Sequence, residues 1–371
     1  MNTQPLQTGG SAGSESPSRR KFLGSVSAAV IAAAQFRAEA FGVGGKTFGI
    51  AYTSFPVRMR QAASATASRA PAIPAEAFID LCHSFGAAGC QMDFAQLRST
   101  EPDYLKSVRA ALARHEMFLE LSVGGKVLDD QEELGRVASA ARQLGVSRLR
   151  VALLSGRRYE NFTNMAKWKD FVNHWKHTLR QVEPALKRHQ LRVGIENHKD
   201  WLADELAEML GRLSSRYLGA CVDFGNNLAL LEDSLEVARK LAPYVVTTHL
   251  KDMALAPYDR GCELSEVPLG DGFLPLARII EILRGRQPDV PFCLEMITRD
   301  PLKIPYRDDA YWVTYERRDR RRVSKFETSL LSQAQDLPLP RISHLAGDRM
   351  QAVEDDNIRR SAHYARQTLN L

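Results

Sequence analysis

Four residues of the types that bind metal ions each follow a short apolar run. Glu196, Asp223, His249 and Glu295 come directly after residues 191–195, 220–222, 245–248 and 292–294. Such runs are typical of buried strands, and parallel strands bring their carboxyl ends to one rim. Three carboxylates on one rim would repel one another unless a cation neutralises them. We therefore expect these four side chains to bind one divalent metal ion.

The donor set narrows the choice of ion only partly. Oxygen-rich ligands with a single imidazole suit Mn²⁺, Mg²⁺, Co²⁺ or Zn²⁺, and the sequence does not select among them. The shortage of thiolate ligands argues against a structural zinc site. Any one of the four could instead cap or anchor a loop, but four in the same position after successive strands favour a metal site.

The elements that must position these ligands alternate along the chain. Short apolar runs predict eight strands at residues 47–52, 89–93, 118–123, 149–154, 191–196, 219–223, 245–250 and 291–295. Between them, apolar residues recur every three or four positions, which predicts helices at residues 76–85, 105–114, 132–144, 168–189, 203–212, 228–241 and 274–284. This alternation predicts an α/β fold, a (β/α)8 TIM barrel, with a doubly wound open sheet as the alternative.

Two regions fall outside this rhythm. Residues 58–74 are rich in Ala, Ser, Arg and Pro and are expected to form a long loop after the first strand, on the active face. Residues 300–371 are expected to form a C-terminal helical extension packed on the barrel, with a helix near residues 325–335. The expected organisation is therefore a signal at residues 1–40, a barrel at residues 41–299 and the extension.

The first 40 residues have the order of an export signal. Arg19, Arg20 and Lys21 precede the small, apolar run 24–34, and Ala38-Glu39-Ala40 follows as a small-x-small cleavage site. This order resembles a bacterial twin-arginine signal peptide cleaved after Ala40, which implies a periplasmic or secreted protein. The apolar run is shorter than the roughly 20 residues that span a bilayer, so no stable membrane anchor is expected after cleavage.

The overall charge does not indicate a nucleic-acid partner. The chain of 371 residues carries a formal charge of +6, part of which lies in the expected signal. The densest basic run, at residues 317–322, has no interleaved aromatic residues that could stack on bases, so a solvated surface is the preferred reading. We expect a small-molecule carbohydrate substrate and no nucleic acid, and self-association into a homo-oligomer stays open.

Several segments resemble the signatures of a known superfamily. These are Ile-Glu-Asn-His at 195–198, Val-Asp-Phe-Gly-Asn at 222–226, His-Leu-Lys-Asp at 249–252, Gly-Asp-Gly at 270–272 and Leu-Glu-Met at 294–296. They resemble the sugar phosphate isomerase/epimerase superfamily, the xylose isomerase-like barrels that include the ketose 3-epimerases and endonuclease IV. The resemblance spans roughly residues 46–299 and is specific for the fold and the metal site but not for the substrate.

The resemblance implies a chemistry. In the ketose 3-epimerases the two metal-bound glutamates exchange the proton beside a carbonyl, which by position are Glu196 and Glu295 here. We expect a metal-dependent isomerase or epimerase that acts on a non-phosphorylated keto-sugar or glycoside derivative through a metal-bound enediolate. A metal-dependent lyase or dehydratase, and a non-catalytic carbohydrate-binding barrel, remain alternatives. Asn226 departs from the usual histidine, which weakens the exact epimerase and the abasic-DNA nuclease assignments.

Other polar residues near the expected rim are candidates for substrate contacts. Lys251 lies two residues after His249, on the same side of its strand, and is expected to stabilise a developing oxyanion as a catalytic group. His198, Asn226, Arg158 and Tyr52 are expected to bind substrate. Two of them have a structural alternative, namely plain loop structure for His198 and a surface arginine for Arg158.

Overall fold

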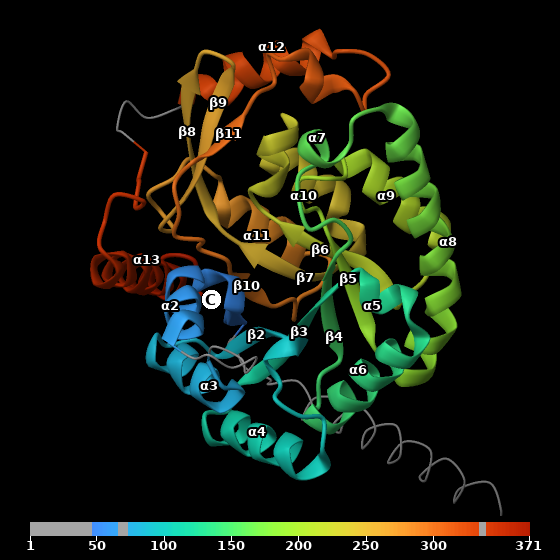
Figure 1. The fold of residues 1–371 in the computed structure, drawn as a ribbon, viewed down its shortest axis with the longest axis vertical. Coiled ribbons are helices and arrows are strands. Elements are labelled where there is room, and N and C mark those ends of the chain that lie inside the picture. Colours follow the sequence, from blue (N-terminus) through green and yellow to red (C-terminus); the bar gives the residue numbers. More distant parts are fainter. Residues whose placement is uncertain (1–46, 66–72, 334–338) are drawn as a thin grey trace, which may run out of the picture. The chain divides into compact units, whose positions relative to one another are not determined.

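The computed structural model describes residues 47–65, 73–333 and 339–371. The expected signal peptide lies outside these residues. Eight parallel strands close into a barrel in the order β1-β10-β7-β6-β5-β4-β3-β2 (Figure 1). Their bounds are β1 Phe48–Ala51, β2 Gly89–Asp93, β3 Phe118–Gly124, β4 Arg148–Ala152, β5 Arg192–Glu196, β6 Leu218–Asp223, β7 Val245–Leu250 and β10 Phe292–Leu294. All eight expected strands are present, and the barrel is closed as predicted.

The strand register sets the height of the ligands on the rim. Asp223 on β6 pairs directly with His249 on β7, and Glu196 on β5 pairs with Cys221, two residues before Asp223. The barrel closes where β1 pairs with β10, with Phe48 opposite Phe292. Because all these strands run in one direction, the residues that end them gather at one mouth of the barrel.

Amphipathic helices surround the strands, as the periodicity predicts. They are α3 Ala75–Ser84, α4 Pro102–Arg114, α5 Lys126–Asp129, α6 Gln131–Leu144, α7 Arg158–Asn161, α8 Met165–His189, α9 Ala203–Leu213, α10 Ser234–Leu241 and α11 Leu276–Arg284. In α9, for example, Ala203, Leu206 and Leu210 are buried at helical spacing. The expected helix at 228–241 is divided, because a 3₁₀ turn, η3 Asn226–Leu230, precedes α10.

The expected loop at residues 58–74 is partly wrong. A helix, α2 Pro56–Ala65, occupies its first half, and residues 66–72 lie outside the described part. Proline at the first helical position and the alanine-rich composition favour this helix despite its weak apolar pattern. The sequence analysis also missed a small antiparallel sheet made of β8 Asp252–Tyr258, β9 Gly261–Val267 and β11 Leu302–Ile304.

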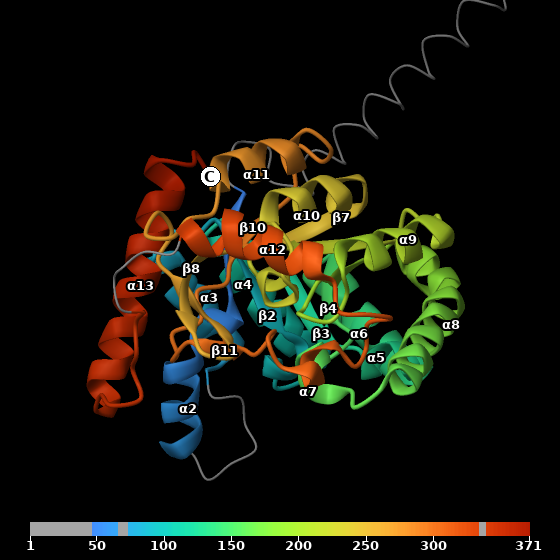
Figure 2. The same ribbon diagram turned by 90° about the horizontal axis from the view of Figure 1, so that it is seen from above.

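The C-terminal segment is helical and contacts the barrel. It contains α12 Arg320–Ser329, the 3₁₀ turn η6 Leu331–Gln333 and the long helix α13 Gly347–Gln367. Helix α13 lies beside α2 in both views (Figures 1 and 2), where the Glu354 carboxylate accepts hydrogen bonds from the backbone N–H groups of Val57 and Arg58 at 2.6 and 3.0 Å. These bonds satisfy two donors that the first turn of α2 would otherwise leave unpaired.

Two further features concern membrane insertion and the cysteines. Among the described residues, none of the helices has the length and apolar character needed to cross a membrane. All five cysteines are buried and free.

Candidate metal centre

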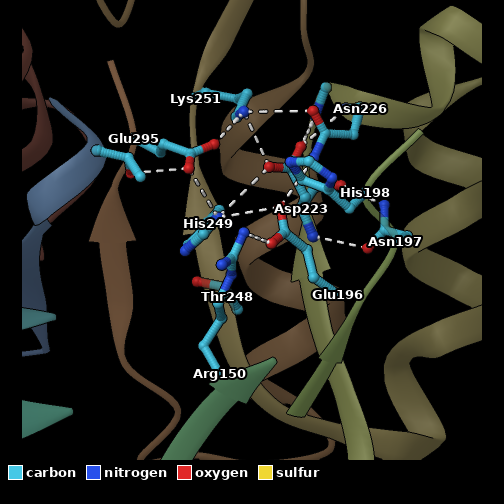
Figure 3. Close-up of polar contacts among 12 residues, drawn as sticks. Arg150, Glu196, Asn197, His198, Asp223, Asn226, Thr248, His249, Lys251 and Glu295 are labelled. Carbon is cyan, nitrogen blue, oxygen red and sulfur yellow. Dashed lines mark hydrogen bonds and ion pairs between the residues drawn. The ribbon is translucent and has the colours of Figure 1, made fainter. Parts of the chain in front are cut away.

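The four expected ligands converge at the carboxyl ends of β5, β6, β7 and β10. One ligand atom from each of Glu196, Asp223, His249 and Glu295 lies within 4.8 Å of the other three. His249 Nδ1 lies centrally, at 3.3 Å from Glu196 Oε1, 3.6 Å from Asp223 Oδ2 and 3.4 Å from Glu295 Oε1 (Figure 3). Two ligands of one ion with bonds of about 2.1 Å lie at most roughly 4.2 Å apart. The three distances to His249 Nδ1 are within that limit.

The donor set has the properties of a cation site. All four residues are at most 3% exposed, and His249 Nδ1 has no hydrogen-bond partner among the described residues. Burial by itself would lower the pKa of His249, but the charges of Glu295 and Glu196 outweigh it and raise that pKa well above its ordinary value. The pocket therefore favours positive charge between its carboxylates, and the residues present fit a divalent ion.

A chain of hydrogen bonds through the barrel interior orients the imidazole. Gln91 Oε1 lies 2.8 Å from His249 Nε2, and Gln91 Nε2 donates to Glu120 Oε2 at 3.2 Å. Since the amide oxygen can only accept, Nε2 carries a proton. When a metal ion displaces the second proton, the lone pair of Nδ1 is directed toward the three carboxylates, which is the tautomer that a metal ligand needs.

Two cations keep the ligand glutamates ionised. Arg150, on β4, forms an ion pair with Glu196 (Figure 3), and Lys251 Nζ lies 2.9 Å from Asp223 Oδ2 and 2.5 Å from Glu295 Oε2. Burial alone would raise the pKa of Glu196, but Arg150 and His249 outweigh it and lower that pKa. The pKa of Glu295 is likewise well below its ordinary value, because His249 and Lys251 overcome the effect of burial.

Asn226 connects the ligand cluster to the loop after β5. Its amide nitrogen donates to Glu196 Oε1 at 2.9 Å, and its amide oxygen accepts from Lys199 and lies 3.5 Å from Lys251 Nζ. The structure thus places Asn226 and Lys251 beside the ligands, as the sequence analysis expects. Lys199 was not among the predicted residues.

His198 lies on the same loop, within the electrostatic reach of the ligands. Its Nδ1 is 3.0 Å from the carbonyl oxygen of Leu154, which fixes the ring, and Figure 3 shows the side chain near Asn197 and Asp223. Burial lowers the pKa of His198 to about 4, and the nearby charges of Lys199 and Arg150 add to that effect. The imidazole is therefore neutral at ordinary pH.

Arg158 and Tyr52 have surroundings other than the ligand cluster. Arg158 donates to Thr314 and Glu205, and its guanidinium stacks 3.8 Å from the centre of the Trp168 ring. It lines a cavity of about 1190 Å³ between α8, α9 and residues 314–322, and none of the four ligands lines that cavity. Tyr52 is half-buried against Phe78, and burial together with Asp93 raises the pKa of its phenol.

The sequence analysis missed several residues that support the site. Thr53 donates to Glu295 Oε1 at 2.8 Å from the turn after β1. The others are Gln91, Glu120, Arg150 and Lys199, described above. Arg150 and Glu120 lie inside strands, where a charged residue in an apolar run was the available signal; Thr53 and Gln91 carry no comparable signal.

The comparisons with known proteins agree with this architecture. Residues 79–315 match the family described as xylose isomerase-like TIM barrel, and the chain belongs to that family. A curated relative is 3-oxo-isoapionate decarboxylase of Pectobacterium atrosepticum, 26% identical over 200 residues that cover 53% of this chain and 68% of the relative.

Solved structures share the fold at low sequence identity. A D-psicose 3-epimerase, solved in the presence of D-fructose, is 13% identical and covers 88% of this chain and 100% of its own, with a TM-score of 0.57. A xylose isomerase-like barrel protein from Mycobacterium smegmatis, solved in complex with magnesium, is 15% identical and covers 77% and 97%, with a TM-score of 0.51. At such identities the likeness concerns the fold.

Proposed function

We propose that this protein is a divalent-metal-dependent enzyme that moves a proton beside a carbonyl group of a non-phosphorylated keto-sugar or glycoside derivative. The observation that carries the proposal is the convergence of Glu196, Asp223, His249 and Glu295 within 4.8 Å, with Lys251 against two of the carboxylates. When bound, the ion would polarise the carbonyl and increase the acidity of the neighbouring C–H bond.

The residues of the chain divide the remaining work. Glu196 and Glu295 are ionised carboxylates on either side of His249, so each can accept a proton from carbon and return it. Lys251 is a permanent ammonium, because Asp223 and Glu295 raise its pKa against the effect of burial. An ammonium at this position stabilises negative charge that develops on a substrate oxygen. The buried setting excludes water from the reacting atoms.

Two measurements test this proposal. Metal analysis of the purified protein should find about one divalent ion per chain, and a panel of keto-sugars in D₂O should show metal-dependent deuterium incorporation beside the carbonyl. Glu295→Gln should abolish the exchange, whereas Glu160→Gln, at a surface ion pair with Arg157, should leave it unchanged. Stoichiometric metal without any exchange would favour the non-catalytic carbohydrate-binding alternative.

A lyase is the second candidate, because the curated relative is named as a decarboxylase. Elimination and decarboxylation both pass through an electron pair beside a carbonyl. Lys251 and a bound ion would stabilise that negative charge, while the carboxylates would hold the ion. The mass of the product separates the candidates: isomerisation or epimerisation conserves it, and a lyase reaction lowers it by the group that departs.

We also propose that the protein is exported by the twin-arginine pathway to the periplasm or beyond. The support is the sequence at residues 18–40, which lies outside the described structure. Expression with Arg19 and Arg20 replaced by lysine should retain the precursor in the cytoplasm, and N-terminal sequencing of the exported protein should begin at Phe41.

A further inference from the structure

The loop after β5 contains a buried cation without an acidic partner. Four lysines and arginines are buried in the described structure, namely Arg148, Arg158, Lys199 and Lys251. Three of them have a carboxylate oxygen close by: Asp289 at 2.8 Å from Arg148, Glu205 at 2.7 Å from Arg158, and Asp223 at 2.9 Å from Lys251. Among the described residues, no carboxylate oxygen lies within 4.0 Å of Lys199 Nζ, which donates instead to the neutral amide of Asn226.

An unpaired buried ammonium is costly for folding. Removing a charge from water without a counter-ion is unfavourable, even after the protein relaxes around it. Burial lowers the pKa of Lys199 to about 8, and the charges of Lys251 and Arg299 add to that effect. A residue placed in this way destabilises the protein in the absence of a ligand, which points to a role outside folding.

The backbone of Lys199 is also held in an unusual conformation. Its φ angle is +66°, in the left-handed region that non-glycine residues seldom adopt. The other five non-glycine residues with positive φ in the described structure lie within three residues after the end of a helix, where this conformation is common; they are Glu116, Gln190, Ser214, Leu231 and Asn370. Lys199 follows a strand.

The surrounding loop enforces this conformation. Asn197 exchanges hydrogen bonds with the backbone of Asp223, and the Asp200 carboxylate accepts from the N–H groups of His198 and Trp201. The carbonyl oxygen of Lys199 accepts from the N–H of Arg158 at 3.0 Å. A rigid loop that places a strained residue next to reactive groups is typical of a functional position.

The charges around the ligands indicate what Lys199 meets. Arg150 pairs with Glu196, Lys251 with Asp223 and Glu295, and Arg299 with Glu266. With Lys199 included, these four carboxylates and four cations cancel. A bound divalent ion would then leave two positive charges in excess among these groups. Such a cluster favours an anionic substrate over a neutral one.

We propose that Lys199 contacts the substrate and binds a carboxylate group on it, so that the substrate is a keto-sugar acid. This inference rests on the proposed function and specifies its substrate class. Asn226 forms hydrogen bonds with both Lys199 and Glu196, so Lys199 lies next to the ligand cluster. A carboxylate bound by Lys199 would therefore belong to a molecule at the metal centre.

Two sugars that differ at one carbon provide the test. 2-Keto-D-gluconate and D-fructose share their keto group and their hydroxyl stereochemistry, but C1 is a carboxylate in the first and a hydroxymethyl group in the second. Calorimetric titration of the Mn²⁺-loaded protein should give at least about tenfold tighter binding of the acid, the size of one charge-assisted contact. Equal affinities, or no measurable binding of the acid, would overturn the proposal.

Variants assign the difference to Lys199. In Lys199→Met the ratio of the two affinities should fall to near one while the Mn²⁺ content stays at the wild-type level. Lys240→Met, which removes a lysine from a surface pair with Asp204, should keep the wild-type ratio. Retention of the preference for the acid by Lys199→Met would refute the assignment.

Stability provides a readout that does not depend on activity. Removal of an unpaired buried cation should leave the melting temperature of the metal-free protein unchanged or higher, whereas loss of a structural lysine would lower it. A fall in the melting temperature of Lys199→Met would therefore contradict the proposal.

A third sugar tests whether Lys199 prefers a carboxylate or a phosphate. Deuterium exchange then distinguishes a failure of this inference from a failure of the proposed function. D-Fructose 1-phosphate carries a dianion on the same carbon, and Lys199-dependent binding of this ester in place of the acid would overturn the choice of carboxylate. Deuterium exchange confined to neutral keto-sugars would overturn this inference and leave the proposed function standing. Lys199-dependent binding of the acid without deuterium exchange would support this inference and overturn the proposed function.

Discussion

Buried carboxyl groups at the rim of the barrel and inside it have pKa values that are shifted in opposite directions. At the rim, Glu196 and Glu295 contact Arg150 and Lys251, and their pKa values are lowered despite burial. Inside the barrel, Glu120 accepts hydrogen bonds from Gln91 and Thr247 and forms no ion pair with any described residue. Burial raises its pKa, and the more distant charge of Arg148 and the hydrogen bonds only partly offset that rise.

The difference shows what burial alone does to an acid. Without a neighbouring cation, a buried carboxyl group favours its neutral form and serves as a hydrogen-bonding element, here at the end of the chain that orients His249. With cations in contact, it keeps its charge and is available to bind a metal ion or to accept a proton. The charge of the rim glutamates thus depends on the neighbouring cations. Substitution of these cations should therefore have the largest effects on stability and metal binding.

The largest effect is expected for Lys251→Met. This change leaves Asp223 and Glu295 buried without their cation, which should destabilise the metal-free protein by about 3–5 kcal/mol. Because Mn²⁺ would neutralise the same carboxylates, the loss should be smaller in its presence. Urea unfolding with EDTA and with Mn²⁺ measures both values, and an equal loss in the two conditions would contradict this account. Lys240→Met should change stability by less than about 1 kcal/mol.

A glutamate-to-glutamine change at the rim and inside the barrel should distinguish a metal ligand from a residue that only supports the site. Glu196→Gln removes a charged ligand atom, so Mn²⁺ affinity should fall by more than the roughly 10–100-fold that loss of an outer partner costs. Glu120→Gln keeps an acceptor oxygen for Thr247 and should change the affinity little. Titration of Mn²⁺ into the two metal-free variants checks this, and similar losses for both would remove the distinction between the regions.

A smaller effect is expected where the two regions meet, at Gln91. Gln91→Leu removes the acceptor that holds the His249 ring, which should weaken Mn²⁺ binding by roughly 10–100-fold while the ligands themselves remain. Gln287→Leu, at a surface contact with Asp289, is the matched control. Wild-type affinity in Gln91→Leu would show that packing alone orients the imidazole.

The smallest effect is expected for Glu354, another carboxyl group whose pKa is raised by burial. Burial raises the pKa of this carboxyl to about 7, although the backbone N–H groups of Val57 and Arg58 oppose the rise. The folded protein therefore binds a proton that the unfolded chain releases near pH 4.5. The corresponding stabilisation is present below that pH and is lost as pH rises through about 7.

This contribution should be on the order of 1–2 kcal/mol. Unfolding of the wild type and of Glu354→Gln between pH 5 and pH 8 isolates it, because the glutamine keeps an acceptor for α2 and does not titrate. The variant should lose less stability than the wild type over this range, and parallel curves would assign the pKa of Glu354 to its ordinary value.

Much of the fold and the ligand set could be predicted because both are written in local patterns. Eight apolar runs identified the eight strands, and the polar residue that ends four of them identified the candidate ligands. The hairpin of β8 and β9 was missed because it directly follows β7, without a helix between them. Helix α2 was missed since its composition resembles that of a loop.

The residues that complete the site depend on distances that no local pattern contains. Arg150 and Glu196 are 46 positions apart, and Gln91 and His249 are 158 apart, so each contact exists only because the barrel closes. By itself, the sequence determined which side chains stand at the ends of the strands, since alternation and apolar runs follow from local backbone geometry. The tertiary structure alone decided which acids meet a cation and which do not, because pKa depends on every charge and on the burial around a group.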